Sequence, residues 1–260
     1  MAEWIQVLWL GVIEGVTEFL PVSSTGHLLI AQRWLGARSD VFNTVIQSGA
    51  VLAVVLIFTT RLRQLAFQWR ERDTQQYLLK LAVAFAITGA GGLLLKKAGF
   101  QLPETARPVA WATLIGGVLF LVVERWLRGR QTRDHISWPA AIAVAFGQLL
   151  AAVFPGASRS GSTILMALCL GVSRSAATEF SFLLGIPTLI AAGALQVYSS
   201  LRDPAAGAED WGLVLVAWVA AAVTAFVAVK WLLGFVQTHT FELFGWYRIV
   251  VGVALLLLAP

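Results

Sequence analysis

The sequence predicts an all-α, polytopic membrane protein with an inverted-topology repeat, and three observations favour this fold class. Of its 260 residues, 58% are hydrophobic and only 13% are charged, whereas an ordinary soluble domain has roughly 25% charged residues. Long segments carry no charge at all, as helices that span a membrane require. Two further segments are apolar but interrupted near their middles by Pro, Gly and Ser, which indicates broken helices within the membrane.

Six uncharged segments are expected to span the membrane. Several reach or approach the roughly 20 residues that a spanning helix needs, and tilt can compensate for the shorter ones. Tryptophans lie near the ends of many of these segments, as expected for side chains that anchor helices at the membrane interface. The predicted spans are Val41–Phe58, Leu81–Leu95, Val109–Val123, Phe180–Tyr198, Trp211–Val229 and Ile249–Ala259.

The distribution of charge predicts membrane topology and not binding of nucleic acid, although the formal net charge is +5. Arginines are concentrated in the loops Arg61–Arg72 and Arg125–Arg133, and two predicted spans separate these loops. Both loops therefore lie on one face, which the positive-inside rule makes cytoplasmic. The loop Arg202–Asp210 and the C-terminus are then expected on the outer face. The single Cys169 provides neither a disulfide nor a metal framework.

The two interrupted segments, Trp4–Leu35 and Trp138–Gly171, are too long for single spans. We expect each to form a re-entrant helical hairpin, with the two polar tips meeting near the middle of the membrane, where inverted repeats place their substrates. The alternative is four ordinary short spans. The spans on either side then run in opposite directions within one membrane domain. The first repeat comprises residues 1–135, with a hairpin at about 4–35 and three spans. The second comprises residues 136–260, with a hairpin at about 138–171 and three spans.

The first interrupted segment contains candidate catalytic groups. Glu14 and Glu18 are four residues apart, so they share one face of a helix, and ionisable side chains at membrane depth are costly enough to indicate function. Beyond the break, hydroxyl groups and an imidazole could supply a nucleophile, a base and a proton relay. A serine-rich turn is also a common helix cap. These residues beyond the break are Ser23, Ser24, Thr25 and His27.

The second interrupted segment contains candidate ligands for an anion. Arg159 could bind a phosphate through two parallel hydrogen bonds, while hydroxyls and the amides of a helix N-terminus bind the remaining oxygens. The alternative is an arginine that extends to the membrane surface. The accompanying residues are Ser158, Ser160, Gly161, Ser162 and Thr163. Together the two tips indicate phosphoryl transfer or hydrolysis, in which catalysis consists mainly of positioning and charge stabilisation.

Three sequence motifs resemble those of the undecaprenyl-diphosphate phosphatases, the bacitracin-resistance family. The first is Glu14–His27, EGVTEFLPVSSTGH, and the second is Pro155–Thr163, PGASRSGST. The stretch Gly171–Phe182, GVSRSAATEFSF, is also similar to the family's sequence after its second motif. The resemblance covers essentially the whole chain, and neither of the first two motifs departs from the family's pattern.

The resemblance implies hydrolysis of the C55 lipid diphosphate to the monophosphate and inorganic phosphate, which recycles the lipid carrier of cell-wall synthesis and confers resistance to bacitracin. It implies catalytic roles for the acidic pair Glu14 and Glu18, the Ser24–His27 element and Arg159. The acidic pair could hold a divalent cation, Mg²⁺ or Ca²⁺, and no organic cofactor is expected. We expect a multi-pass protein of the bacterial plasma membrane whose site opens to the periplasmic or extracellular side. A homodimer is left open.

Two other classes of protein are compatible with parts of the sequence. A secondary transporter or a flippase for an anionic lipid would also have inverted repeats, broken helices and charges at membrane depth. Such a protein needs ligands for its substrate but no activated nucleophile, so Ser24 and His27 beside two acids favour the phosphatase. A purely structural scaffold would have no use for buried carboxylates and a buried arginine. Ser24 is the preferred nucleophile, and His27 remains the rival.

Overall fold

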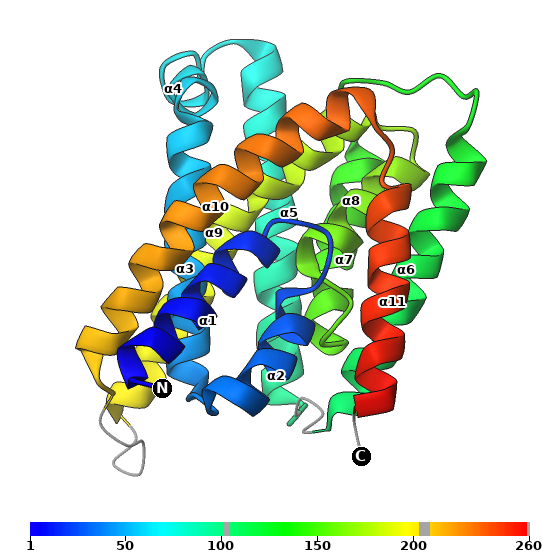
Figure 1. The fold of residues 1–260 in the computed structure, drawn as a ribbon. Helices are drawn as coiled ribbons and strands as arrows, with labels where there is room; N and C mark the ends of the chain where they lie inside the picture. Colours follow the sequence, from blue (N-terminus) through cyan, green and yellow to red (C-terminus); the bar gives the residue numbers. More distant parts are fainter. Residues whose placement is uncertain (101–104, 203–208, 259–260) are drawn as a thin grey trace.

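A computed structural model describes residues 1–100, 105–202 and 209–258 of the chain, and this part folds as a bundle of eleven α-helices (Figure 1). An all-helical fold follows from the apolar composition, because helices satisfy their backbone hydrogen bonds internally at membrane depth. The helices are α1 (Glu3–Thr17), α2 (Ser24–Leu35), α3 (Asp40–Ile57), α4 (Thr59–Phe67), α5 (Arg72–Lys97), α6 (Ala106–Leu127), α7 (Trp138–Val153), α8 (Arg159–Cys169), α9 (Arg174–Arg202), α10 (Trp211–Thr238) and α11 (Glu242–Leu258).

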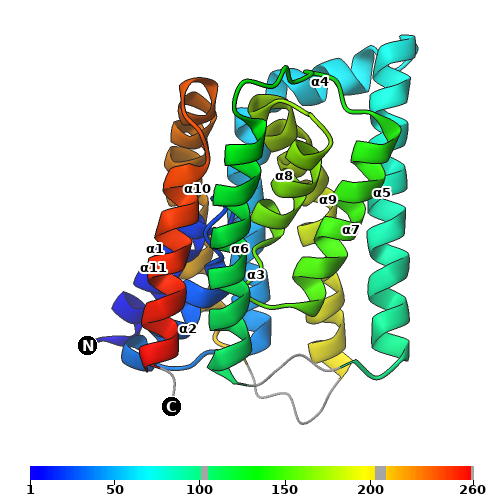
Figure 2. The ribbon, with the colours of Figure 1, turned by 90° about the vertical axis from the view of Figure 1, so that its right-hand side faces the viewer.

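Five helices are long and apolar enough to cross a membrane, namely α3, α5, α6, α9 and α10. They contain the first five predicted spans, except that Phe58, the last residue of the first span, lies just beyond α3. The chain is therefore a polytopic, α-helical membrane protein. The sixth predicted span lies in α11, which has 17 residues and begins with a charged one, Glu242. Ala259, where this span was expected to end, lies outside the described residues. The helix α11 packs along α6 (Figure 2). The short helix α4, in the first basic loop, was not predicted.

The two hairpins enter the bundle from opposite ends. Figures 1 and 2 show α4 and the connection from α6 to α7 at one end, and the N-terminus and the end of α11 at the other. The hairpin α1–α2 begins and ends near the N-terminus, whereas α7 and α8 begin and end near α4. At 15, 12, 16 and 11 residues, these four helices are shorter than a membrane span. The predicted re-entrant hairpins are therefore confirmed, and the alternative of four short spans is wrong.

The packing of helices pairs the first part of the chain with the second. The helix α1 packs on α10, and its counterpart α7 packs on α5; likewise α10 contacts α3, and α5 contacts α9. This order of contacts is what two inverted repeats would produce. The division into residues 1–135 and 136–260 stays a prediction. The loop Arg202–Asp210 cannot be placed in full, because residues 203–208 lie outside the described part.

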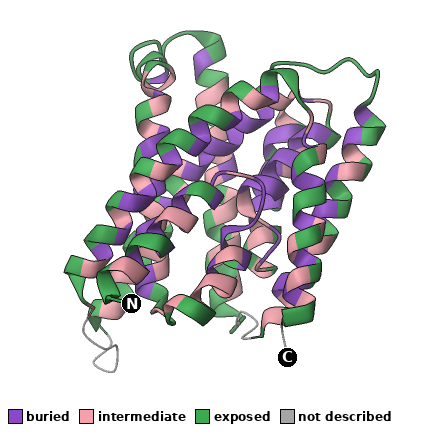
Figure 3. Cartoon of the chain, in the orientation of Figure 1, coloured by how far each residue is buried: buried purple, intermediate pink, exposed green. Residues whose placement is uncertain are grey.

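Both hairpin tips are largely buried (Figure 3), and many large apolar side chains of the surrounding helices are exposed. Close packing of α1 on α10 depends on two glycines. A Cβ atom at Gly11 would lie 2.2 Å from the backbone oxygen of Ala217, and one at Gly15 would lie 2.3 Å from that of Ala221. Small residues of this kind let membrane helices approach backbone to backbone. This contact fixes α1, which carries Glu14 and ends immediately before Glu18.

Candidate active site

Both hairpin tips have the same local backbone, and in each a serine caps the returning helix. Ser23 and Ser158 have φ angles of 72° and 68°, a left-handed conformation that is uncommon outside glycine. Each serine side chain accepts a hydrogen bond from a helix amide, that of Gly26 in the first tip and that of Gly161 in the second. The helices α2 and α8 therefore both begin at the tips. Their N-termini carry partial positive charge, which is suited to an anion.

Glu18 connects the two tips through both of its carboxylate oxygens. Ser24 Oγ donates a hydrogen bond of 2.7 Å to Oε2 of Glu18, and Arg159 Nη2 lies 3.2 Å from Oε1. Glu18 and Ser24 are buried, and the side chain of Arg159 is 13% exposed. A carboxylate that accepts a hydrogen bond from a hydroxyl can activate that hydroxyl as a nucleophile, and the guanidinium beside it can stabilise the charge of a phosphate. The structure thus brings together three of the five predicted catalytic residues.

Arg159 lies in a compartment whose walls sequence reasoning did not predict. Its guanidinium carbon is 5.1 Å from the centre of the Phe19 ring, and Nη1 lies 3.5 Å from the backbone oxygen of Ser181. A Cβ atom at Gly185 would lie only 2.5 Å from Nη1. The absence of a side chain at Gly185 therefore makes the space for the guanidinium. The resemblance of the sequence around Ser181 to the family was the one signal that pointed to this wall.

Gly185→Ala is expected to displace the guanidinium of Arg159 and to reduce turnover about 10- to 100-fold, since a misplacement of about 1 Å can cost 10²-fold. The fold should persist, because the atom in the way belongs to the end of a flexible side chain. Gly193→Ala is the matched control on the same helix, since a Cβ atom there would lie 3.9 Å from the closest atom, the backbone oxygen of Thr44. Steady-state kinetics of both variants test this, and equal turnover in the two would contradict the assigned role of Gly185.

Glu14 lies one helical turn before Glu18 and is completely buried. Neither of its carboxylate oxygens has a hydrogen-bond partner within the described part of the protein. Such unpaired polar atoms are costly in a protein interior, so Glu14 is suited to a proton or a cation. Within the described residues, no group of three or more His, Cys, Asp or Glu side chains could hold a metal ion. Glu14 and Glu18 are the residues here that would hold a cation, since carboxylate oxygens are ligands that Mg²⁺ and Ca²⁺ accept.

His27 is directed away from the pair formed by Ser24 and Glu18. Its Nδ1 is 2.7 Å from the backbone oxygen of Ser23, and its Nε2 is 2.7 Å from the hydroxyl of Tyr247, whose ring stacks on the imidazole. A carbonyl oxygen only accepts hydrogen bonds, so Nδ1 carries the proton and Nε2 faces Tyr247. In this arrangement Glu18, and not His27, is placed to receive the proton of Ser24. Tyr247 was not predicted from the sequence.

Most of the predicted anion ligands of the second tip bond to protein in this structure. Ser160 Oγ donates to the backbone oxygen of Leu20 at 3.0 Å and so joins the tips. Thr163 Oγ1 bonds to the backbone of α8 and to Ser181, and Ser162 Oγ lies 3.4 Å from the backbone oxygen of Ala157. In the first tip, Thr25 is exposed. Their roles as substrate ligands, with those of Ser23, Ser158 and Gly161, stay predictions.

Arg248, on α11, is a buried residue that bonds to both tips, and sequence reasoning missed it. It is 0% exposed, and its guanidinium donates to the backbone oxygens of Pro21 in the first tip and of Gly156 and Ala157 in the second. Further bonds reach two backbone oxygens of α6. Arginine suits this position because its five donors lie in one rigid plane. Arg248 therefore holds the two tips in register.

Arg248→Met is expected to lower stability by several kcal/mol, since each buried carbonyl left without a partner costs about 1–3 kcal/mol. Turnover should fall as well, because the tips lose their common anchor. Thermal unfolding in detergent measures the effect. The control is Arg63→Met, which removes an exposed arginine of α4 and should leave the melting temperature near that of the native protein. Native stability of the Arg248 variant would show that the tips are held in place by other contacts.

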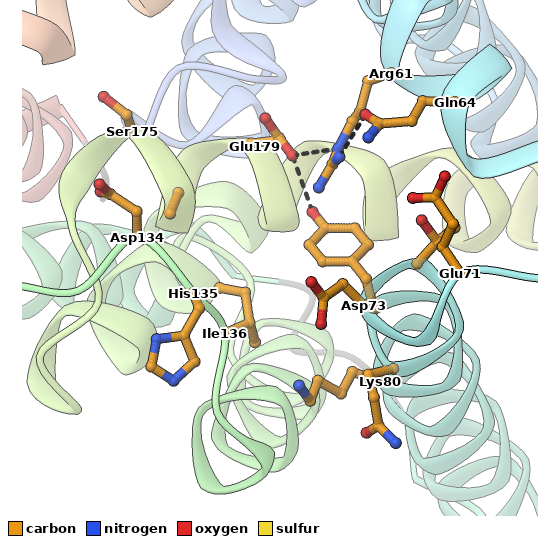
Figure 4. Close-up of a pocket in the computed structure, with 14 residues that line it drawn as sticks. Arg61, Gln64, Glu71, Asp73, Lys80, Asp134, His135, Ile136, Ser175 and Glu179 are labelled. Carbon is orange, nitrogen blue, oxygen red and sulfur yellow. Dashed lines mark hydrogen bonds and ion pairs between the residues drawn. The ribbon is translucent and has the colours of Figure 1, made fainter. Parts of the chain in front are cut away.

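A cavity lies away from these residues, near the end of the molecule that carries α4. It has a volume of about 820 Å³ and includes none of the predicted site residues (Figure 4). One wall of the cavity is held together by hydrogen bonds to Glu179. Arg61 Nε lies 2.9 Å from Glu179 Oε1, and the Tyr77 hydroxyl donates to the same oxygen at 3.3 Å. This cavity contains charges of both signs, but its hydroxyl–carboxylate pair is the phenol of Tyr77 with Glu179, and no residue of the two hairpin tips lines it. We therefore place the active site at the tips.

The fold and the tips define a class: a polytopic membrane protein in which two re-entrant hairpins hold a serine, a carboxylate and an arginine in contact. Comparison with known proteins specifies it further. A family model described as "Bacitracin resistance protein BacA" matches residues 7–254. The chain belongs to this family.

Curated relatives span its whole length. One from Xanthomonas oryzae pv. oryzae (strain PXO99A) is 53% identical over 261 residues, covering 100% of this chain and 98% of the relative. One from Rhizobium etli is 51% identical over 255 residues, covering 98% and 96%. Both are named "Undecaprenyl-diphosphatase".

Proposed function

We propose that the protein is a membrane-embedded phosphatase that hydrolyses undecaprenyl diphosphate to undecaprenyl phosphate and inorganic phosphate. One observation carries the proposal: Ser24 Oγ is 2.7 Å from Glu18, and Arg159 lies on the other oxygen of the same carboxylate. The names of the relatives support the choice of substrate. This activity returns the lipid carrier to cell-wall synthesis and removes the target of bacitracin. No feature of the tips favours transport as the sole function.

In the first step, Ser24 Oγ attacks the terminal phosphorus of the diphosphate while its proton passes to Glu18. The bond between that phosphorus and the bridging oxygen breaks, and the lipid monophosphate leaves with the proton that Glu18 took from the serine, which restores the carboxylate. In the second step, water attacks the phosphoserine with Glu18 as the base, and the proton returns to Ser24 Oγ as inorganic phosphate departs. The carboxylate is placed for both proton transfers by its hydrogen bond to the serine.

The charge that develops on the phosphate oxygens is stabilised from the second tip. Arg159 is paired with Glu18 at 3.2 Å before substrate binds. Once Glu18 has accepted the serine proton, the guanidinium is released to bind the transferring group, where its planar fork matches phosphate oxygens. The N-termini of α2 and α8 add backbone amides and the positive ends of two helix dipoles. These groups are fixed by the fold before the reaction, so they need little reorganisation.

Glu14 and Glu18 are the residues that would hold a divalent cation, Mg²⁺ or Ca²⁺. The unpaired, buried oxygens of Glu14 support this assignment. Bound there, the cation would neutralise charge on the diphosphate oxygens. We propose no organic cofactor.

Phosphate release from undecaprenyl diphosphate by purified protein, with and without a chelator, tests the activity and the cation together. Release is expected from the native protein, and chelation should reduce it. Absence of release in the presence of Mg²⁺ and Ca²⁺ would overturn the phosphatase, while unchanged release after chelation would overturn only the cation.

We further propose a bacterial plasma membrane location, with the basic loops in the cytoplasm and the first hairpin entering from outside. The arginine-rich connections at the α4 end of the molecule support this orientation. Single cysteines placed in a Cys169→Ser background test it. An impermeant maleimide applied to intact cells should label Ala37→Cys, between α2 and α3, but not Gln131→Cys, between α6 and α7. The reverse pattern would invert the proposed topology.

A further inference from the structure

An apolar groove lies beside the second hairpin tip, and the mechanism above makes no use of it. It has a volume of about 610 Å³, and all of its lining residues are apolar. One wall comes from α5 with Leu94 and Leu95, and the opposite wall comes from α7 with Leu150 and Val153. Leu94 is 66% exposed and Leu150 is 39% exposed, so both side chains face the surroundings of the bundle. At this depth those surroundings are the acyl chains of the bilayer.

Two lining residues of the groove lie close to Arg159 along the chain, on either side of it. Phe154, another lining residue, is the C-cap of α7, and the tip that follows it leads directly to Arg159. Met166 lines the groove from α8 and is seven residues beyond Arg159, about 10 Å along the helix. A molecule with its phosphate at Arg159 and a chain of a few carbon units could therefore reach the groove.

The groove exists because the two hairpins are packed differently. At the corresponding place in the first half, α1 lies directly on the backbone of α10, since Gly11 and Gly15 leave no gap. The helix α5 approaches α7 through Gly91, where a Cβ atom would lie 2.5 Å from the Leu149 side chain, and the leucines on either side keep the backbones apart. Only 6% of the most apolar part of α5 is buried. A groove is therefore present between α5 and α7, whereas the corresponding helices α1 and α10 are packed too closely to leave one.

We propose that this groove binds the first part of the polyprenyl chain of the diphosphate substrate, an inference that rests on the proposed function. The substrate must place a charged head group at the tips and a long apolar chain in the bilayer, so the chain has to leave the site by an apolar path open to lipid. The groove provides that path, and its open side accepts a chain longer than the groove itself. Since lipid is as apolar as the groove, binding there gives little hydrophobic gain. Its effect is to orient the head group.

Filling the groove tests the proposal. Leu94→Trp and Leu150→Trp narrow it from opposite walls, and Val227→Trp is the control on α10, at a side chain that is 65% exposed and outside the groove. For undecaprenyl diphosphate, kcat/KM should fall about tenfold in both groove variants, the size of effect that poor fit in an apolar pocket produces. The control should match the native protein. Native kcat/KM in both groove variants would overturn the proposal.

A binding measurement keeps the test decisive if a tryptophan variant fails to fold. In a Cys169→Ser background, undecaprenyl phosphate should slow modification of Leu150→Cys by an apolar thiol reagent several-fold and leave Val227→Cys unaffected. Inorganic diphosphate should protect neither. Equal protection by a bilayer phospholipid, or none by undecaprenyl phosphate, would overturn the groove as a polyprenyl site. Failure of the proposed function would be seen separately, as no phosphate release by the native protein.

Discussion

Replacing Ser24 with alanine is expected to abolish turnover, by about 10⁴-fold or more, as removal of a catalytic nucleophile does in other hydrolases. The variant should still bind substrate, because the N-termini of α2 and α8 remain in place. The structure supports this expectation through the 2.7 Å hydrogen bond from Ser24 Oγ to Glu18. Single-turnover phosphate release and lipid binding measure the two effects separately. Ser48→Ala, which removes a hydroxyl of α3 bonded to Trp218, is the control and should keep native turnover.

Trapping the phosphorylated enzyme distinguishes Ser24 from its rival, His27. Phosphoserine survives an acid quench, whereas phosphohistidine is labile in acid and stable in base. We expect an acid-stable adduct, because both ring nitrogens of His27 are engaged by Ser23 and Tyr247. An acid-labile adduct, or near-native turnover in Ser24→Ala, would exclude the serine.

Replacing Glu18 with glutamine is expected to reduce turnover by about 10²–10⁴-fold, the usual contribution of general acid–base catalysis. The amide keeps the size of the side chain but cannot accept the serine proton, and it leaves Arg159 without its ion-pair partner. Some loss of thermal stability should accompany the change, since a partly buried guanidinium then lacks a counter-charge. Pre-steady-state phosphate release measures the chemical step directly.

Glu3→Gln is the matched control for this change, because Glu3 lies on α1, the helix that ends immediately before Glu18. It breaks the pair with Arg38, in which the Glu3 side chain is 60% exposed, and exposed pairs contribute little to stability. Turnover and stability of this control should remain native. A well-folded Glu18→Gln protein that also turns over at the native rate would rule out Glu18 as the base.

The sequence was sufficient to predict most of the fold. The spans could be predicted from the uncharged segments, because a charged side chain at membrane depth is costly and spanning helices therefore contain few of them. The Pro, Gly and Ser residues that interrupt two apolar segments predicted both hairpins. The structure confirms them, because in each hairpin the second helix begins directly after a capping serine, Ser23 or Ser158. The short helix α4 was missed because it lies among arginines at the membrane surface, where hydropathy carries no signal. The helix α11 is longer than its predicted span because it continues past Arg248 to Glu242.

By itself, the sequence predicted the polar residues of the two motifs as members of the candidate site. These residues are polar but lie within apolar segments, a contrast that can be recognised in the sequence without the structure. They are Glu14, Glu18, Ser24 and Arg159. Only the tertiary structure decided how they meet. Glu18 and Arg159 are 141 residues apart in the chain, and their contact depends on how two hairpins from opposite ends of the bundle face one another.

The tertiary structure also decided which neighbours each group has. Gly185 makes room for Arg159, Tyr247 binds His27 and Arg248 ties the tips together, although none of the three belongs to the two polar motifs. The physical reason is that hydropathy reports how deep a segment lies in the membrane, whereas the direction in which a side chain points is set by helix packing. That packing depends on contacts between residues far apart in the chain, and local sequence does not encode them.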